Sequence, residues 1–252
     1  MASIDLTRDG TVAVVTINNP GKRNAMTDDM WRQIPAVMRE IDGDDDLHAT
    51  VLTGAGDVFC AGADIAALDE LNHAERPINA EMAIAASPKP VIAAIEGPCF
   101  GGGVQMAVAA DLRVASSEAT FSVPPARLGV VYPVSATERM IHLMGPSVTK
   151  EMLFTAERLD AQRALAVGLL NRVVAPGEAL ATALELAERM AGLSQLTMRA
   201  SKEIVDGLVA RDLSAETAIA WVARAASGPD LLEGKQAFLE RRAPQFTWRP
   251  GS

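Results

Sequence analysis

A turn of consecutive glycines, Gly101 to Gly103, constrains this 252-residue chain more than any other stretch. It follows a short apolar run, residues 91–95, whose proline and glycine boundaries predict a buried strand. It precedes residues 104–110, which are small and apolar and predict a buried helix. The amides that open a helix lack partners within it and lie at the positive end of its dipole. The turn therefore predicts either tight helix–strand packing or a site for a phosphate or a developing oxyanion.

A second stretch has the same order of strand, turn and helix. Residues 49–54 predict another buried strand, and residues 56–65 follow as a turn of small residues and the start of a helix. Two such turns could offer two converging amides to one oxygen atom. The glycine turn itself is not followed by Gly-Lys-Ser or Gly-Lys-Thr, and it lacks the Gly-x-Gly-x-x-Gly spacing. Phosphate loops and dinucleotide fingerprints are therefore excluded for this stretch.

Several motifs in a fixed order, spread over nearly the whole chain, resemble the crotonase family, also called the enoyl-CoA hydratase/isomerase family. They are Asn24-Ala25-Met26, Phe59-Cys60-Ala61-Gly62-Ala63-Asp64-Ile65, the three glycines, residues 164–171 and the tail 233–242. The resemblance implies an α/β fold, a spiral of repeated ββα units over residues 1–195 that holds an acyl-CoA site. It also implies a C-terminal helical trimerisation region, residues 196–252. The assembly expected is a homotrimer or a hexamer built as a dimer of trimers.

Composition and charge limit the possible partners. The net charge is −9 and 49% of the residues are hydrophobic, so we expect a packed core and no binding to nucleic acid or an anionic membrane. No apolar run is long enough to span a membrane, and no signal peptide is evident, which predicts a cytoplasmic protein. The two cysteines carry no disulfide-framework or metal signal. We expect no metal and no cofactor beyond the coenzyme A moiety of the substrate.

Hydrophobic periodicity predicts the remaining elements. The first two strands form a hairpin at Asp9-Gly10, and Thr27 caps a helix that contains Pro35. Residues 66–76 are mixed in character and predict a mobile or partly helical segment. Residues 124–133 predict an irregular shaped loop. Further helices are predicted over 78–86, 135–144, 147–155, 160–167, 177–191, 195–211, 214–226 and 230–240, and further strands over 111–115, 120–123 and 171–174.

The resemblance assigns roles to single positions. Members of the family bind the thioester carbonyl oxygen with two backbone amides, which map here onto Ala61 and Gly102. Positions that hold the adenine end of coenzyme A map onto Ala63 and Ile65. The cations near its phosphates map onto Lys22 and Arg23. The tail positions that reach a neighbouring subunit's coenzyme A map onto Phe238 and Arg241. Plain surface charge is the alternative explanation for the three cations.

Two departures from the family's pattern bear on the reaction. A hydratase of this family uses two glutamates to position water and shuttle a proton. Their positions hold Gln105 and Pro125 here, neither of which can exchange a proton near neutral pH. Pro133 occupies the place of the nucleophilic aspartate of a dehalogenase-type member. Standard hydration, isomerisation and covalent dehalogenation are therefore not expected.

The chain's one tyrosine, Tyr132, suggests a different reaction. Its loop looks closest to the methylmalonyl-CoA decarboxylase branch, although that branch carries a histidine at Ala63 and an acid at Gln105. Decarboxylation needs no base to begin, which fits a site poor in carboxylates. Our best hypothesis is thus a decarboxylase-like lyase. The alternatives are a non-catalytic acyl-CoA binder, or a hydratase/isomerase using a non-standard acid such as Glu138. The sequence does not specify the acyl group.

Overall fold

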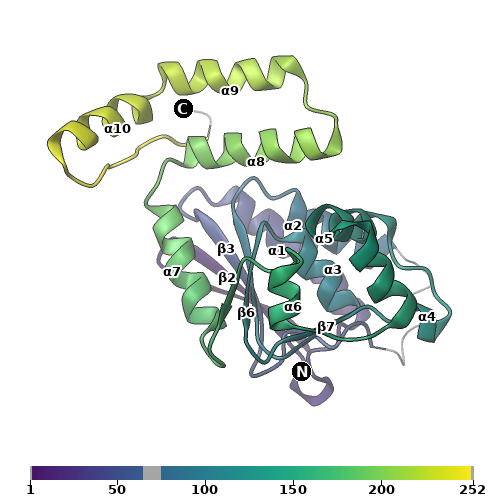
Figure 1. Ribbon diagram of the computed structural model, residues 1–252. Helices are drawn as coiled ribbons and strands as arrows, with labels where there is room; N and C mark the ends of the chain where they lie inside the picture. The colour runs from purple at the N-terminus through teal and green to yellow at the C-terminus, as the bar shows by residue number, and fades with distance from the viewer. Residues whose placement is uncertain (1, 65–74, 251–252) are drawn as a thin grey trace.

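The computed structural model describes residues 2–64 and 75–250 (Figure 1). Its centre is a six-stranded sheet in the order β1-β2-β3-β4-β6-β9. β1 and β2 pair as the expected antiparallel hairpin, with Gly10 in the left-handed region, and every other neighbouring pair is parallel. The strands are β1 (Ser3–Asp9), β2 (Val12–Asn18), β3 (Ala49–Gly54), β4 (Val91–Ile95), β6 (Leu112–Ser116) and β9 (Arg172–Val174).

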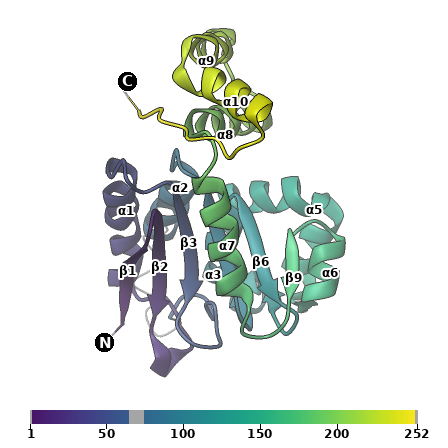
Figure 2. The ribbon, with the colours of Figure 1, turned by 90° about the vertical axis from the view of Figure 1, so that its left-hand side faces the viewer.

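Helices cover both faces of this sheet (Figure 2). Successive residues of a strand point to opposite faces, so Val51 belongs to one apolar cluster and Leu52 to the other. Helix α7 (Ala179–Ala191) packs on the Val51 side. On the Leu52 side lie α1 (Asp28–Gly43), α2 (Glu75–Ala85), α3 (Gly102–Ala109) and α5 (Val134–Thr155).

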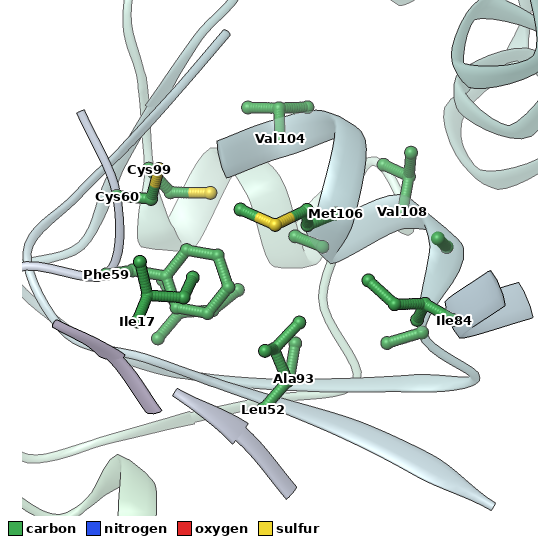
Figure 3. Packing of buried hydrophobic residues seen from close by; sticks show 14 of the residues in the cluster. Ile17, Leu52, Phe59, Cys60, Ile84, Ala93, Cys99, Val104, Met106 and Val108 are labelled. Atoms are coloured by element: carbon green, nitrogen blue, oxygen red, sulfur yellow. The ribbon is translucent and has the colours of Figure 1, made fainter. Parts of the chain in front are cut away.

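The larger core lies between the sheet and α3. Figure 3 shows Phe59, Ile17 and Leu52 packed beneath that helix, with Met106 pointing toward them. All four side chains are buried. Residues 103–109 of α3 are all buried, and apart from Gln105 they are glycine or apolar, which agrees with the predicted buried helix.

A second sheet of three short strands extends the glycine turn. β5 (Pro98–Phe100), which directly precedes the glycines, pairs with β7 (Thr120–Ser122), and β7 pairs with β8 (Leu159–Asp160). Neither β5 nor β8 was predicted, because strands this short carry no periodic signal. A small helix α6 (Ala161–Ala166) follows β8.

The segment expected to be an irregular loop contains one turn of helix, α4 (Pro125–Leu128), and the expectation of no helix there was wrong. Pro125 is at the first helical position, where its missing N–H costs nothing, and Gly129 ends the turn in the left-handed region. The two helices predicted on either side of Gly145 form α5, with a kink at that glycine. The predicted helix start at Ile65 and most of the mixed segment 66–76 lie outside the described residues.

Three C-terminal helices form a layer apart from the sheet (Figures 1 and 2). They are α8 (Gln195–Ala210), α9 (Ala215–Ser227) and α10 (Pro229–Glu240). Lys202 of α8 donates to Asp111 at 2.8 Å, and Arg249 of the tail contacts His48 at 2.8 Å, so the layer is tied back to the core. The division of the chain at residue 195 into two units stays a prediction.

Candidate functional site

Two segments that are distant in sequence run side by side at the glycine turn. Cys60 and Cys99 form a parallel bridge. The Cys60 amide donates to the Pro98 carbonyl at 3.1 Å, and the Phe100 amide donates to the Cys60 carbonyl at 2.9 Å. The segment after β3 is therefore fixed against the strand that leads into the three glycines.

The loop around Asn24 holds the segment after β3 from its other side. Asn24 is buried in the left-handed conformation, and its Nδ2 donates to the Val58 carbonyl at 2.6 Å. The Met26 amide donates to the Gly62 carbonyl at 2.8 Å, and the Asp64 amide donates to the Met26 carbonyl at 2.9 Å. An asparagine suits this position because its short amide tolerates positive φ and bonds to nearby backbone.

Two of the glycines are required by close packing. A Cβ on Gly103 would lie 2.6 Å from the Cys60 carbonyl oxygen, and one on Gly102 would lie 2.8 Å from the indole of Trp31. Gly62 opposite has a φ of 106°. Close packing thus explains both Gly102 and Gly103, and it leaves open what the amides of the turn do.

The amide of Ala61 is not free. It donates to the Arg23 carbonyl at 3.0 Å, which contradicts the expectation that it is one of the two oxyanion donors. The mapping failed because sequence shows which residues form the loop but not which of their amides the neighbouring backbone uses.

Two other amides are free and adjacent. Within the described residues, neither the Ala63 nor the Gly102 N–H donates to any acceptor. A Cβ built on Gly102 would lie 3.6 Å from the Ala63 nitrogen, so the two amides belong to neighbouring backbone. Gly102 is the first residue of α3, where the helix dipole adds positive potential. This pair of amides can receive an anionic or strongly polarised oxygen.

Tyr132 lies at the glycine turn rather than at a solvent rim. Its hydroxyl donates to the Gly101 carbonyl at 2.8 Å, and its ring packs against the larger core. Burial, assisted by the nearby Cys99 and Glu81, raises the pKa of Tyr132 well above its usual value. The phenol is therefore neutral and a hydrogen-bond donor at physiological pH.

Gln105 contacts a carboxylate that the sequence analysis missed. The Gln105 Nε2 donates to Glu81 Oε2 at 3.0 Å, and both side chains are buried. Glu81 also accepts hydrogen bonds from Ser135 Oγ at 2.9 Å and from Arg139 Nε at 3.1 Å. One signal could have identified it: Glu81 lies three residues before Ile84 on the apolar face of α2, where an acid is exceptional.

At Pro125 the structure places no side-chain acid of its own to replace the missing glutamate. This residue is buried at the start of α4, and its carbonyl accepts from the Val130 amide at 3.3 Å. Glu138, considered above as a non-standard acid, is exposed on α5. Among the acids of the described residues, Glu81 is thus the one that the structure brings against Gln105.

The remaining predicted contacts are scattered. Lys22 is exposed and forms an ion pair with Asp64 at 2.5 Å, and Arg23 is exposed beside it. Phe238 and Arg241 lie on α10 and at its end, in the layer away from the glycine turn, so one chain does not bring them to the site (Figure 1). Ile65 lies outside the described residues. The roles of these residues in binding coenzyme A stay predictions.

The two cysteines near the turn are buried and free. Burial raises the pKa of the Cys60 thiol to about 12 and the pKa of the Cys99 thiol well above its usual value, so neither is a ready nucleophile. In the part of the chain that the structure describes, no group of three or more potential metal ligands occurs. None of the helices seen there is long and apolar enough to cross a membrane.

A cavity of about 720 Å³ lies elsewhere, between the turn at Ser87 and helices α8 and α9. Arg199, Lys202 and Trp221 are among the side chains that line it, and none of the residues of the two loops described above does. The candidate site therefore rests on the free amides of the described residues and the side chains around them, not on this cavity.

Comparison with known proteins identifies the family. The model of the enoyl-CoA hydratase/isomerase family matches residues 7–249, and the chain belongs to this family. The short-chain-enoyl-CoA hydratase of Clostridium acetobutylicum is 35% identical, over 95% of each chain. The crotonyl-CoA hydratase of Syntrophomonas wolfei is 34% identical, over 97% of each. An enoyl-CoA hydratase/isomerase family protein from Hyphomonas neptunium has a crystal structure that matches with a TM-score of 0.93 and 38% identity, over 98% of each chain.

Proposed function

We propose that this protein binds an acyl-CoA thioester and stabilises its enolate with the amides of Ala63 and Gly102. The observation that carries the proposal is that these two amides are adjacent and have no acceptor among the described residues, while the Ala61 amide is occupied. When a thioester loses a proton or group at its α-carbon, negative charge moves onto the carbonyl oxygen. Preset donors stabilise that charge without reorganising, and each is worth roughly 2.7–4 kcal/mol in comparable sites.

The reaction that we propose is addition or removal of water, or a proton shift, at a short acyl thioester. The names of the relatives, short-chain-enoyl-CoA hydratase and crotonyl-CoA hydratase, support this class. Gln105 and Pro125 mean that the chain would carry it out without the paired glutamates. The decarboxylase-like hypothesis rests on Tyr132 alone and finds no support among these relatives, and a non-catalytic binder is not favoured by them either.

A substrate panel tests the proposal. Purified protein is incubated with crotonyl-CoA, 3-hydroxybutyryl-CoA and methylmalonyl-CoA, and products are identified by mass spectrometry. We expect crotonyl-CoA to gain the mass of water. Loss of carbon dioxide from methylmalonyl-CoA would replace this reaction with decarboxylation. If none of the three substrates changes mass but calorimetry still detects binding, the protein binds acyl-CoA without converting it.

The role of the two amides is tested by removing the ligand's oxygen, because a backbone donor cannot be deleted by a side-chain substitution. Butyryl-CoA is compared with S-butyl-CoA, a thioether that lacks the carbonyl oxygen. We expect the thioester to bind more tightly in calorimetry. Equal affinities would show that the carbonyl oxygen does not lie on the Ala63 and Gly102 amides.

We further propose that the chain assembles with copies of itself, as a trimer or a dimer of trimers. Apolar side chains of the C-terminal layer are exposed in the single chain, and large exposed apolar surfaces mark interaction sites. Phe238 and Arg241, remote from the site of their own chain, would then be free to approach the site of a neighbour. The exposed apolar residues of this layer include Val205, Leu208, Ile219, Val222, Leu231, Leu232, Phe238 and Leu239.

A further inference from the structure

Glu81 is a buried carboxylate with three side-chain donors among the described residues. Its side chain is 0% exposed, and it accepts hydrogen bonds from Gln105 of α3 and from Ser135 and Arg139 of α5. A buried charge costs several kcal/mol unless it is paired and hydrogen-bonded. Arg139 supplies the opposite charge, and the other two donors satisfy Oε2. Burial of the Glu81 carboxylate is costly, so packing alone does not account for its position against Gln105 at the first turn of α3.

The carboxylate dictates how Gln105 is oriented. The Gln105 Nε2 donates to Glu81 Oε2 at 3.0 Å, so the nitrogen of the amide faces Glu81. Its carbonyl oxygen, Oε1, then faces away from Glu81. Among the described residues, no donor contacts this Oε1. A hydrogen-bond acceptor of fixed direction is thus left open at the helix turn that carries the Gly102 amide.

We propose that Glu81 is a positioning residue of the acyl site, holding the Gln105 amide so that Oε1 accepts a hydrogen bond from a water molecule or from the C3 hydroxyl of a 3-hydroxyacyl thioester. This inference rests on the function proposed above and narrows it. Gln105 would orient the oxygen that is added or lost, and the Ala63 and Gly102 amides would hold the thioester. In this role Glu81 serves as the acceptor for Gln105, Ser135 and Arg139 and orients the amide.

The same contact explains why a glutamate at position 105 is unsuited to this chain. Its carboxylate would lie about as close to Glu81 as the Gln105 nitrogen does now, 3.0 Å. Two carboxylates at that separation cannot both be ionised at little cost. We therefore expect one of positions 81 and 105 to carry a carboxylate and the other to carry an amide.

Four variants test the proposal on the purified full-length chain with crotonyl-CoA and 3-hydroxybutyryl-CoA. Glu81→Gln removes the charge that dictates the orientation of the amide, and we expect kcat to fall about tenfold or more with KM nearly unchanged. Glu151→Gln, at an exposed acid further along α5, is the matched control and should keep the wild-type kcat. Gln105→Glu alone should lower Tm, and the exchange of both residues, Glu81→Gln with Gln105→Glu, should restore it, since the hydrogen bond is kept.

The outcomes separate this inference from the proposed function. A wild-type protein that binds and converts no acyl-CoA overturns the function. An active wild type whose Glu81→Gln variant retains kcat within twofold overturns the positioning role, as does a Gln105→Glu variant as stable as the wild type.

A measurement on the wild-type protein covers the case in which Glu81→Gln does not fold. The side-chain amide signals of glutamine are followed by nitrogen-15 NMR, with Gln105→Ala to assign them. We expect the Gln105 signal to shift with 3-hydroxybutyryl-CoA and not with free coenzyme A. Identical spectra with the two ligands would overturn the role.

Discussion

Helices α7 and α9 have the same length, 13 residues, and opposite surroundings. Helix α7 buries Ala179, Ala183 and Ala187 on the central sheet, so its apolar face is small and flat. Helix α9 buries none of its residues within the described chain, and Ile219 and Val222 are each 68% exposed. Both helices are amphipathic by sequence, but α9 is contacted by α8 and α10 of its own layer and still leaves most of Ile219 and Val222 in solvent.

The contrast extends to the two regions that contain these helices. The α/β core buries two apolar clusters against its sheet and holds the amides of the candidate site, although Val131, Val134 and Phe154 are exposed there. In the C-terminal layer, large apolar side chains are exposed on α8, α9 and α10 alike. Since monomeric proteins rarely expose continuous apolar patches of large area, the layer is the part of the molecule whose stability we expect to depend on other copies. Substitutions in the two regions should therefore differ in what they disturb, and four predictions follow from the largest expected effect to the smallest.

A matched pair of phenylalanines gives the sharpest contrast. Phe59→Ala empties a fully buried position under α3 and should lower the free energy of unfolding by about 3–5 kcal/mol. Phe238→Ala removes a side chain that is 82% exposed on α10 and should change that free energy by about 0.5 kcal/mol or less in the dissociated chain. Urea unfolding at low protein concentration measures both. Equal losses in the two variants would remove the distinction between the regions.

The contact between the two loops gives the next largest effect. Gly103→Ala places a methyl group against the Cys60 carbonyl, and we expect a loss of about 1–3 kcal/mol from overpacking. Gly43→Ala at the end of α1 is the control, because a Cβ there meets no atom within 4 Å. That variant should be as stable as the wild type or more stable by up to about 1 kcal/mol. Urea unfolding compares the two, and a Gly103→Ala variant of wild-type stability would contradict the close packing.

A charge on the C-terminal layer should alter assembly more than folding. Leu232→Asp introduces an acid at an exposed position of α10, where the free energy of unfolding of one chain should change by about 0.5 kcal/mol or less. Sedimentation velocity should show a trimer or hexamer for the wild type and a smaller species for the variant. A wild-type protein that sediments as a single chain would refute the role proposed for this layer.

The junction of the two regions should show a small dependence on pH. Burial, together with Arg249 and Lys89, lowers the pKa of His48 below 6.5. Its Nδ1 contacts the Ala191 carbonyl at 3.2 Å and its Nε2 contacts Arg249 at 2.8 Å, an arrangement that needs a neutral ring. The unfolded chain therefore takes up the proton first as pH falls below 6.5, and stability should decline there. Thermal unfolding at pH 7.5 and 5.5 should show a smaller decline for His48→Gln, and identical declines would exclude this cause.

The fold was largely predictable because its main elements are long or strongly periodic. The hairpin at Gly10, the Thr27-capped helix with Pro35 inside it, and the strands at 49–54 and 91–95 are each set by local pattern. β5 and β8 were not predictable, because their pairing depends on segments far away in sequence.

The site was predictable only as far as the segments that build it. Sequence identified the loops of Ala61 and Gly102 as partners, but the choice between the Ala61 and Ala63 amides depends on where the Arg23 carbonyl lies in space. Glu81 was not identified from the sequence because its role depends on contacts with Gln105 and Arg139, which lie on other helices. The sequence pattern thus located the loops that form the site. Tertiary contacts determine which of their amides and side chains can bind a ligand.

The position of Tyr132 has a practical consequence. It is the only tyrosine in the chain, and its hydroxyl is bonded to the carbonyl of the glycine that precedes Gly102. Any ligand that displaces this bond changes the environment of a single phenol. The protein therefore carries a built-in optical reporter at its candidate site, and tyrosine ultraviolet difference spectra could follow ligand entry without any label.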